Sequence, residues 1–333
     1  MVNTPRRVLS VGGVGVDIFF CLSGYLISTI LLREKERTKT IDFASFYIRR
    51  VFRIVPPVLL YLGVIFALRT LHFLPPSKTN DIIASLLFYR NYSSGGDWYT
   101  GHFWSLAIEE QFYLVAPLFL LLLPVRKAIV ASLTLILICV ATRYLEYRED
   151  WFTDTLLLRT ENRYDGLLWG VMLGLLMSHQ ATTVLLRKYL SGLAVISVLL
   201  ASIAIVLCVP SQATHRTVVA FLMPWLIGFS IIRKDSTLTR TLQLKPLRIV
   251  GTISYSLYIW QMLFLTPDYV PRALGVLQSQ PLALALSLLC AGFSYLVIER
   301  PFILIGRAIV RPRQKSKPAN YHLILDPRPR LSK

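Results

Sequence analysis

The sequence predicts an all-α protein, a polytopic bundle of about nine transmembrane helices. Two observations lead to this prediction. Of the 333 residues, 54% are hydrophobic and only 16% are charged, whereas a soluble domain carries about a quarter charged residues. Long apolar runs also follow one another along the chain, and no soluble domain interrupts them.

Each expected span is an apolar run bounded by charged or turn-forming residues. In chain order the expected spans are Gly12–Leu32, Pro56–Leu74, His102–Pro124, Ala128–Ala141, Gly166–Ser178, Leu190–Val209, Thr217–Ile232, Ile249–Thr266 and Pro281–Glu299. Between the first two lies a basic amphipathic stretch, Asp42–Ile54, which Asp42 would cap and Pro56-Pro57 would end. We expect residues 1–305 to form the transmembrane domain and residues 306–333 a basic, disordered cytoplasmic tail.

The basic residues determine the expected orientation. The formal net charge is +18, but the lysines and arginines gather in alternate short loops and in the tail, so nucleic acid is not an expected partner. By the positive-inside rule these loops and the C-terminus are cytoplasmic. The N-terminus, with Arg6 and Arg7, is then outside, and one further helix before Gly12 would resolve that awkward arrangement. The four cysteines lie within apolar runs without metal-ligand spacing, so no metal site is expected.

The third expected span begins at His102 and carries two adjacent carboxylates, Glu109 and Glu110. A charge inside a membrane helix costs at least ~2.5 kcal/mol, and such groups usually face the bundle interior. Helical spacing places His102 and Glu109 on one face, where they could serve general acid–base chemistry. Two alternatives stay open: Glu109 could be a structural anchor paired with Arg69 or Arg163, and His102 an interfacial residue without a role.

A second group of charges follows the first span. Arg49 and Arg53 share a helix face, and Arg50 lies beside them. These guanidiniums could bind phosphate groups or contact anionic lipid headgroups. The sequence thus predicts a basic centre facing the cytoplasm and a polar centre facing outward. The outward centre would contain Asp17, His102, Glu109, Arg163 and Asp165; we interpret Asp165 as a helix N-cap and Arg163 as a functional candidate.

Six motifs occur in order along the chain. They are GVDIFFCLSGYLIS (Gly15–Ser28), FYIRRVFRIVPP (Phe46–Pro57), HFWSLAIEEQFYL (His102–Leu114), NRYDGLLWGVMLG (Asn162–Gly174), GTISYSLYIWQ (Gly251–Gln261) and SYLVIERP (Ser294–Pro301). In sequence, order and spacing they resemble the membrane-bound acyltransferase 3 family, from the first span to the last. The resemblance implies a bundle of about ten helices that transfers acyl groups, often acetyl, from cytoplasmic acyl-CoA to hydroxyls of carbohydrates and related acceptors.

The resemblance also implies roles for individual residues. Arg49, Arg50 and Arg53 match the arginine motif that meets the donor, Glu109 matches the carboxylate of the WSL-x-x-E signature, and Arg163 a later arginine. We therefore expect an O-acyltransferase of the bacterial inner membrane that acetylates a cell-envelope carbohydrate or a lipid-linked sugar. Glu109, His102 and Arg163 are the expected catalytic residues. Acyl-CoA is the expected donor substrate, and no permanently bound cofactor is expected.

The chain departs from the family pattern at two places. The family normally has a helix before GVDIFF with an arginine and a histidine that looks like the catalytic base, and Met1–Val11 contains nothing similar. The family often has Trp-His after the SYSLY motif, whereas Gln261 follows Trp260 here, and glutamine takes no proton at neutral pH. A late start codon, a fragment or a degenerate enzyme would explain these departures.

Two other functions stay open from the sequence. One is a transporter of a small anion or a lipid-linked sugar, although the two matching halves typical of many transporters are not found in this sequence. The other is an inactive relative that acts as an assembly partner.

Overall fold

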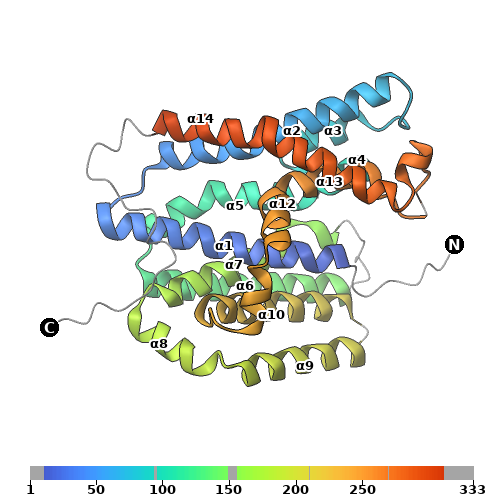
Figure 1. The fold of residues 1–333 in the computed structure, drawn as a ribbon. Coiled ribbons are helices and arrows are strands. Elements are labelled where there is room, and N and C mark those ends of the chain that lie inside the picture. The colour runs from blue at the N-terminus through green and yellow to red at the C-terminus, as the bar shows by residue number, and fades with distance from the viewer. Residues whose placement is uncertain (1–10, 94–95, 149–155, 210, 269, 311–333) are drawn as a thin grey trace.

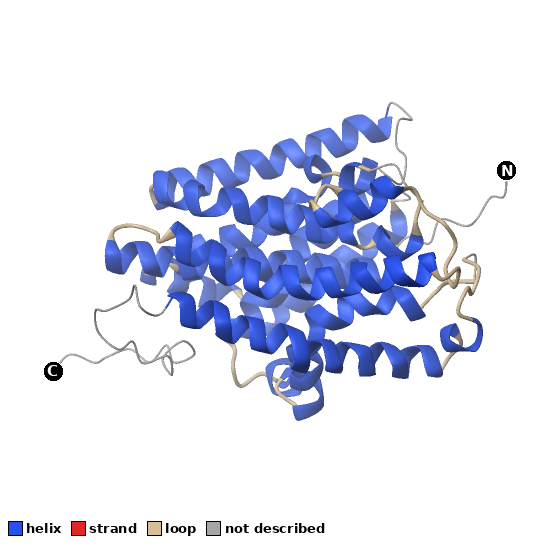
Figure 2. Ribbon diagram, turned by 90° about the horizontal axis from the view of Figure 1, so that it is seen from above, coloured by secondary structure: helices blue, strands red, loops and turns tan. Residues whose placement is uncertain are grey.

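The computed structural model describes residues 11–93, 96–148, 156–209, 211–268 and 270–310. These residues form helices joined by loops, with no strand among them (Figures 1 and 2). The helices are α1 (Val11–Thr38), α2 (Phe43–Thr70), α3 (Thr79–Leu86), α4 (Trp98–Gly101), α5 (Phe103–Leu122), α6 (Val125–Arg148), α7 (Thr160–Met177), α8 (Gln180–Tyr189), α9 (Gly192–Cys208), α10 (Gln212–Ile232), α11 (Thr237–Leu242), α12 (Lys245–Phe264), α13 (Leu282–Ser294) and α14 (Arg300–Val310). A π-helical segment, Tyr295–Glu299, joins the last two. The predicted all-α class is therefore confirmed for the described part of the chain.

Six helical segments in the described ranges are long and apolar enough to cross a membrane. They are Gly13–Thr38, Phe43–Thr70, Trp98–Leu122, Val125–Tyr147, Gln212–Ile232 and Leu282–Val310. Helices α7 and α8 would make a seventh span, but the chain bends by 114° between them. Helix α9 is apolar but has only 17 residues, about 26 Å of helix. Every predicted span overlaps a helix, but the predicted count of about nine spans is not confirmed.

The long helices run back and forth along one common direction (Figure 1). Helices α1, α5, α7 and α10 all begin at one end of the bundle, which we call the Asp17 end. We call the opposite end, where α1 finishes and α2 begins, the Lys35 end. Helix α12 differs, because it crosses the front of the bundle at a steep angle to the others (Figure 1).

Two helix ends at the Lys35 end are closed by side chains. The backbone N–H of Ser45 donates to Asp42 Oδ1 at 3.0 Å, so the predicted N-cap of α2 is confirmed. The ammonium of Lys35 donates to three carbonyls at the end of α5, those of Leu120, Leu121 and Leu123, at 2.7, 2.9 and 3.1 Å. The last carbonyls of a helix have no partner within it, so this lysine satisfies them and ties α1 to α5.

Helix α2 does not end at Pro56-Pro57 as the sequence analysis predicted. It contains both prolines and continues without interruption to Thr70. Two prolines remove two backbone hydrogen bonds, but in a membrane bundle neighbouring groups can satisfy the freed carbonyls. The carbonyls that lose their donors are those of Phe52 and Arg53. Beside them, the hydroxyl of Tyr255 donates to the carbonyl oxygen of Ile54, at 2.8 Å, and ties α12 to this turn. The basic stretch is therefore the first part of a spanning helix and not a separate surface helix.

Small residues allow α1 and α7 to pack with their backbones in contact. A Cβ added at Gly170 would collide with the carbonyl oxygen of Cys21, and one at Gly174 with the hydroxyl of Ser28. Gly24 faces the backbone of α7 in the same way. Stripes of small residues at such spacing are typical of closely packed membrane helices. This contact fixes the position of α1, which carries Asp17 and Ser23 of the candidate site.

Large apolar side chains remain exposed on the outside of the bundle. They include Leu114, Leu118 and Leu122 on α5, Leu137 on α6, Leu193, Leu200 and Leu207 on α9, and Leu289 and Phe293 on α13. A soluble monomer rarely exposes so much contiguous apolar surface, whereas a lipid-facing surface does. Helix α14 extends the last span through Val310, so the beginning of the predicted tail is helical, and residues 311–333 lie outside the described ranges.

Candidate active site in the helix bundle

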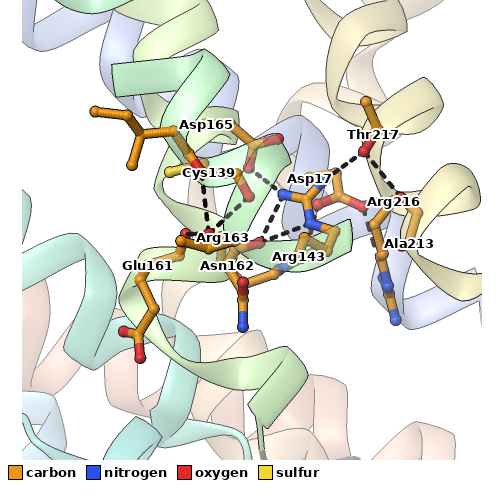
Figure 3. A network of polar contacts seen from close by, with 12 residues as sticks. Asp17, Cys139, Arg143, Glu161, Asn162, Arg163, Asp165, Ala213, Arg216 and Thr217 are labelled. Atoms are coloured by element: carbon orange, nitrogen blue, oxygen red, sulfur yellow. Dashed lines mark hydrogen bonds and ion pairs between the residues drawn. The ribbon is translucent and has the colours of Figure 1, made fainter. Parts of the chain in front are cut away.

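A network of buried charges lies at the Asp17 end, where four helices meet (Figure 3). Arg163 on α7 pairs with Asp17 on α1 at 2.6 Å. Arg143 on α6 pairs with Asp165 on α7 at 2.8 Å. Arg216 on α10 lies 3.8 Å from the second oxygen of Asp17. Asp17, Arg163 and Asp165 therefore lie together at one end of the bundle, as the sequence predicts.

This network corrects the interpretation of Asp165. It was interpreted as an N-cap, but α7 begins at Thr160, and Asp165 lies buried inside the helix as the partner of Arg143. Arg143 is fully buried and also donates to the carbonyl oxygen of Asn162. Sequence analysis missed Arg143 because it stands at the end of an apolar run and was assigned to a loop. The signal in the sequence that could have identified Arg143 was its position directly after an apolar run.

His102 lies just before α5, at the same end of the bundle. Its ring is buried and lies in an aromatic cage, 5.5 Å from the ring of Tyr61 and 5.4 Å from that of Tyr258 between ring centres. The ring lies near the backbone of Ile259, but neither ring nitrogen makes a well-aligned hydrogen bond among the described residues. A buried imidazole without a committed partner is available to bind or accept a proton.

Tyr258 connects His102 to α5. Its hydroxyl donates to the carbonyl oxygen of His102 at 2.8 Å and lies 2.5 Å from Ser105 Oγ. The sequence analysis assigned no role to Tyr258, although its place in the SYSLY motif was a signal that could have identified it. Ser105 is buried, as are His102 and Glu109, which helical spacing places on one face.

Glu109 lies two turns further along α5, in the middle of the bundle. It accepts hydrogen bonds from Ser23 Oγ on α1, at 2.5 Å, and from the hydroxyl of Tyr113. The alternative in which Glu109 pairs with Arg69 or Arg163 is wrong, because Arg69 pairs with Asp97 at 2.6 Å and Arg163 with Asp17. A carboxylate in the bundle that is held by two hydroxyl donors keeps its oxygens fixed in position.

The arginine motif reaches Glu109 through an aromatic ring. The guanidinium of Arg50 lies 4.8 Å from the centre of the Tyr113 ring and 5.6 Å from that of Phe46. Arg49 is half-buried and Arg53 exposed. Glu109 was predicted to belong with the outward polar centre, but it lies beside Arg50 because Tyr113 bridges the two helices. The two predicted centres are therefore linked along α5.

A second buried carboxylate, Glu299, closes the π-helical segment at the end of the SYLVIERP motif. It accepts a hydrogen bond from Ser256 Oγ at 2.8 Å and is in electrostatic contact with Arg53. Short π-helical segments are frequent at functional sites. The sequence analysis quoted the motif but assigned no role to this residue.

Two open hollows lie beside the end of α2 and the start of α4. The larger, of about 730 Å³, is lined by residues that include Arg69, His72 and Ser77. The smaller, of about 510 Å³, is lined by residues that include Asp97, Trp98 and Tyr99. Tyr99 accepts a hydrogen bond on its carbonyl oxygen from Tyr61, which also packs on His102. Tyr61 therefore links Tyr99, at the smaller hollow, to His102.

The helices and the buried charges define a multi-pass membrane protein with a polar site inside its bundle. The family model described as an acyltransferase domain, that of acyltransferase 3, matches residues 2–299. The chain belongs to this family, which confirms the resemblance that the motifs predicted.

Curated relatives agree with this assignment. The O-acetyltransferase OatA of Staphylococcus aureus (strain MRSA252) is 30% identical over 95% of this chain and 57% of its own length. The putative peptidoglycan O-acetyltransferase YrhL of Bacillus subtilis is 29% identical over 87% of this chain and 50% of its own. The peptidoglycan O-acetyltransferase OatA of Listeria monocytogenes is 27% identical over 87% and 51%. The chain thus spans about half the length of these relatives, and no solved structure matches it.

Proposed function

We propose that this protein transfers an acetyl group to a hydroxyl of a cell-wall carbohydrate, with acyl-CoA as the donor. The acceptor class rests on the relatives, which are named as O-acetyltransferases; one is named for peptidoglycan, and a second as a putative peptidoglycan O-acetyltransferase. The observation that carries the mechanism is the polar column along α5. Ser105, Glu109 and Tyr113 lie on it, with His102 at one end and Arg50 at the other.

The donor would bind at the Lys35 end. Arg49, Arg50 and Arg53 present guanidiniums there, and arginine binds phosphate oxygens with bidentate hydrogen bonds. Arg50 is held by Phe46 and Tyr113, so its position is fixed before the donor arrives. From His102 to Tyr113 the column spans about 16 Å at 1.5 Å per residue. The donor's thioester arm would lie along this column.

The acceptor would bind at the Asp17 end, at the hollows lined by Arg69, Asp97 and Trp98. His102 would take the proton of the acceptor hydroxyl as its oxygen attacks the acyl carbonyl. The bond from carbon to sulfur then breaks, the ester bond forms, and the thiolate takes the proton back from His102. Tyr258 and Ser105 position His102, and Glu109 with Tyr113 positions the thioester arm. Arg163 supplies fixed positive charge at this end, which favours the developing oxyanion.

Transfer in proteoliposomes tests this proposal. The purified chain is reconstituted and supplied with acetyl-CoA labelled in the acetyl group and with a cell-wall glycan. Label should enter the glycan as an ester that mild alkali releases, and Glu109→Gln, His102→Gln and Arg50→Ala should each lower the rate by at least about tenfold. Glu36→Gln, an exposed carboxylate at the end of α1, is the control and should keep full activity. Movement of acetate or sugar across the bilayer without label transfer would instead indicate a transporter.

A further inference from the structure

The charge network at the Asp17 end contains an arginine in excess. Arg143, Arg163 and Arg216 face two aspartates, Asp17 and Asp165. Each aspartate already has a close arginine partner, at 2.6 and 2.8 Å. Among the described residues Arg216 makes a single ion pair, of 3.8 Å to Asp17 Oδ2. That distance is too long for a hydrogen bond.

The donors of this network are only partly used. Arg216 has a side-chain exposure of 21%, so it is reachable from outside although most of it is enclosed. Nε of Arg163 is buried and has no hydrogen-bond partner among the described residues. A buried or half-buried guanidinium without a hydrogen-bonded counterion is costly. Helices α1, α7 and α10 also begin here (Figure 1), and helix starts add positive potential.

Two further carboxylates of the described ranges lie near this network. Glu146 is half-buried and is bound by Asn162 Nδ2 at 2.5 Å. Glu161 is half-exposed, pairs with Arg159 at 3.8 Å and accepts from Tyr92. In the described ranges neither makes an ion pair with the three arginines of the network. Figure 3 shows Arg216 on the side of the network opposite Asp165.

We propose that Arg216, with Arg163 beside it, binds an oxyanion, a carboxylate or a phosphate, at the Asp17 end of the bundle. The oxyanion completes the charge balance of the network and uses the free donors. It accepts a bidentate pair from Arg216, the geometry for which a guanidinium is suited. Because the acceptor is expected at this end, the oxyanion belongs to the acceptor, which is therefore an anionic carbohydrate. That last step rests on the proposed function, whereas the binding of the oxyanion does not.

Binding is measured without any transfer reaction. The full chain, purified in detergent, is heated in increasing sodium phosphate or sodium acetate, with sodium chloride holding the ionic strength constant. The unfolding midpoint should rise and saturate with an oxyanion, and the phosphate and acetate arms show which kind binds more tightly. In Arg216→Gln the half-saturating concentration should rise by about tenfold or more. The matched control Arg248→Gln, an exposed arginine on α12, should behave as the unchanged chain does.

An unchanged half-saturating concentration in Arg216→Gln would overturn the site, as would a wild-type midpoint that rises no more than in chloride alone. If Arg216→Gln does not fold, Arg216→Lys decides. Lysine keeps the charge but lacks the planar fork, so the half-saturating concentration should rise by about threefold or more. An unchanged value in that variant would equally refute the proposal.

Transfer kinetics then test the assignment to the acceptor. A glycan fragment with free carboxylates or phosphates is compared with the same fragment after these groups are converted to neutral derivatives. Arg216→Gln should raise KM for the charged fragment by about tenfold and leave KM for the neutral one unchanged. Equal effects on both fragments would show that the oxyanion is not part of the acceptor. If the unchanged chain acetylates neither fragment, the proposed function fails, and the unfolding experiment still decides whether the oxyanion site exists.

Discussion

Arg50 and Glu109 belong to different helices and are connected by one residue, Tyr113. The guanidinium of Arg50 lies 4.8 Å from the centre of the Tyr113 ring, and the hydroxyl of Tyr113 donates to Glu109. A cation over an aromatic ring gains about 0.5–2 kcal/mol. The arginine motif and the acidic motif, 59 positions apart in the sequence, therefore form one unit, so a change at either residue is felt by the other.

Replacing Arg50 by lysine should weaken donor binding more than it slows the chemical step. Lysine can still approach the Tyr113 ring but cannot give a bidentate pair of hydrogen bonds to a phosphate. KM for acetyl-CoA should rise by about tenfold, while kcat falls by less than about threefold. Steady-state transfer in proteoliposomes measures both constants. Arg240→Lys, an exposed arginine in α11, is the control and should change neither; a fall in kcat with no change in KM would argue against phosphate binding at Arg50.

Tyr258→Phe should lower kcat and leave the fold intact. The change removes one hydroxyl, which bonds to the carbonyl oxygen of His102 and to Ser105. Loss of this bond should cost about 1 kcal/mol of stability, but kcat should fall by about tenfold or more because His102 is no longer held in position. Tyr144→Phe is the matched control, since its hydroxyl bonds to Thr214 between α6 and α10. Equal kcat values in the two variants would remove Tyr258 from the site.

The helices could be predicted from the sequence because apolar runs of sufficient length have few other possibilities in a lipid bilayer. Where each span ends was less predictable. Pro56-Pro57 is a strong stop signal in a soluble helix, yet α2 passes through it. The hydroxyl of Tyr255, which bonds to Ile54 beside the two prolines, comes from a helix 201 positions away in the chain. No local pattern carries that information.

The candidate site was predictable residue by residue but not in its pairings. Helical periodicity correctly placed His102 and Glu109 on one buried face. It could not show that Glu109 is bound by Ser23 and Tyr113, because Ser23 lies on α1 and its position depends on how α1 packs against its neighbours. Arg143 and Arg216 were missed for the same reason. The partner of a single arginine near an apolar run depends on helix packing, which here brings these two arginines to Asp165 and Asp17.

The buried pair of Arg143 and Asp165 should be sensitive to the loss of one partner. Arg143 is fully buried, and its side chain also donates to Asn162 and Thr217. Arg143→Met leaves Asp165 buried without its partner and should lower the free energy of unfolding by about 3–5 kcal/mol. The midpoint of thermal unfolding in detergent measures this loss.

An exposed pair provides the comparison for that measurement. Arg159 and Glu161 lie 3.8 Å apart, with side-chain exposures of 42% and 37%. Arg159→Met should therefore lower stability by less than about 1 kcal/mol. Similar losses from the two arginine variants would mean that the buried network contributes no more than a solvated pair.

Gly170→Ala should separate α1 from α7 and so disturb both halves of the site at once. The added methyl group would collide with the carbonyl oxygen of Cys21, and a backbone carbonyl cannot rotate away as a side chain can. Overpacking of this kind costs about 1–3 kcal/mol or more, and the shift of α1 should weaken the contact of Ser23 with Glu109. Gly63→Ala, within α2, meets nothing within 4 Å and should stabilise the helix by about 0.5–1 kcal/mol. The midpoint of thermal unfolding and the transfer rate should both fall in Gly170→Ala. In Gly63→Ala the midpoint should rise slightly, and the transfer rate should stay unchanged. If Gly170→Ala kept both, α1 would not be fixed by direct contact with the backbone of α7.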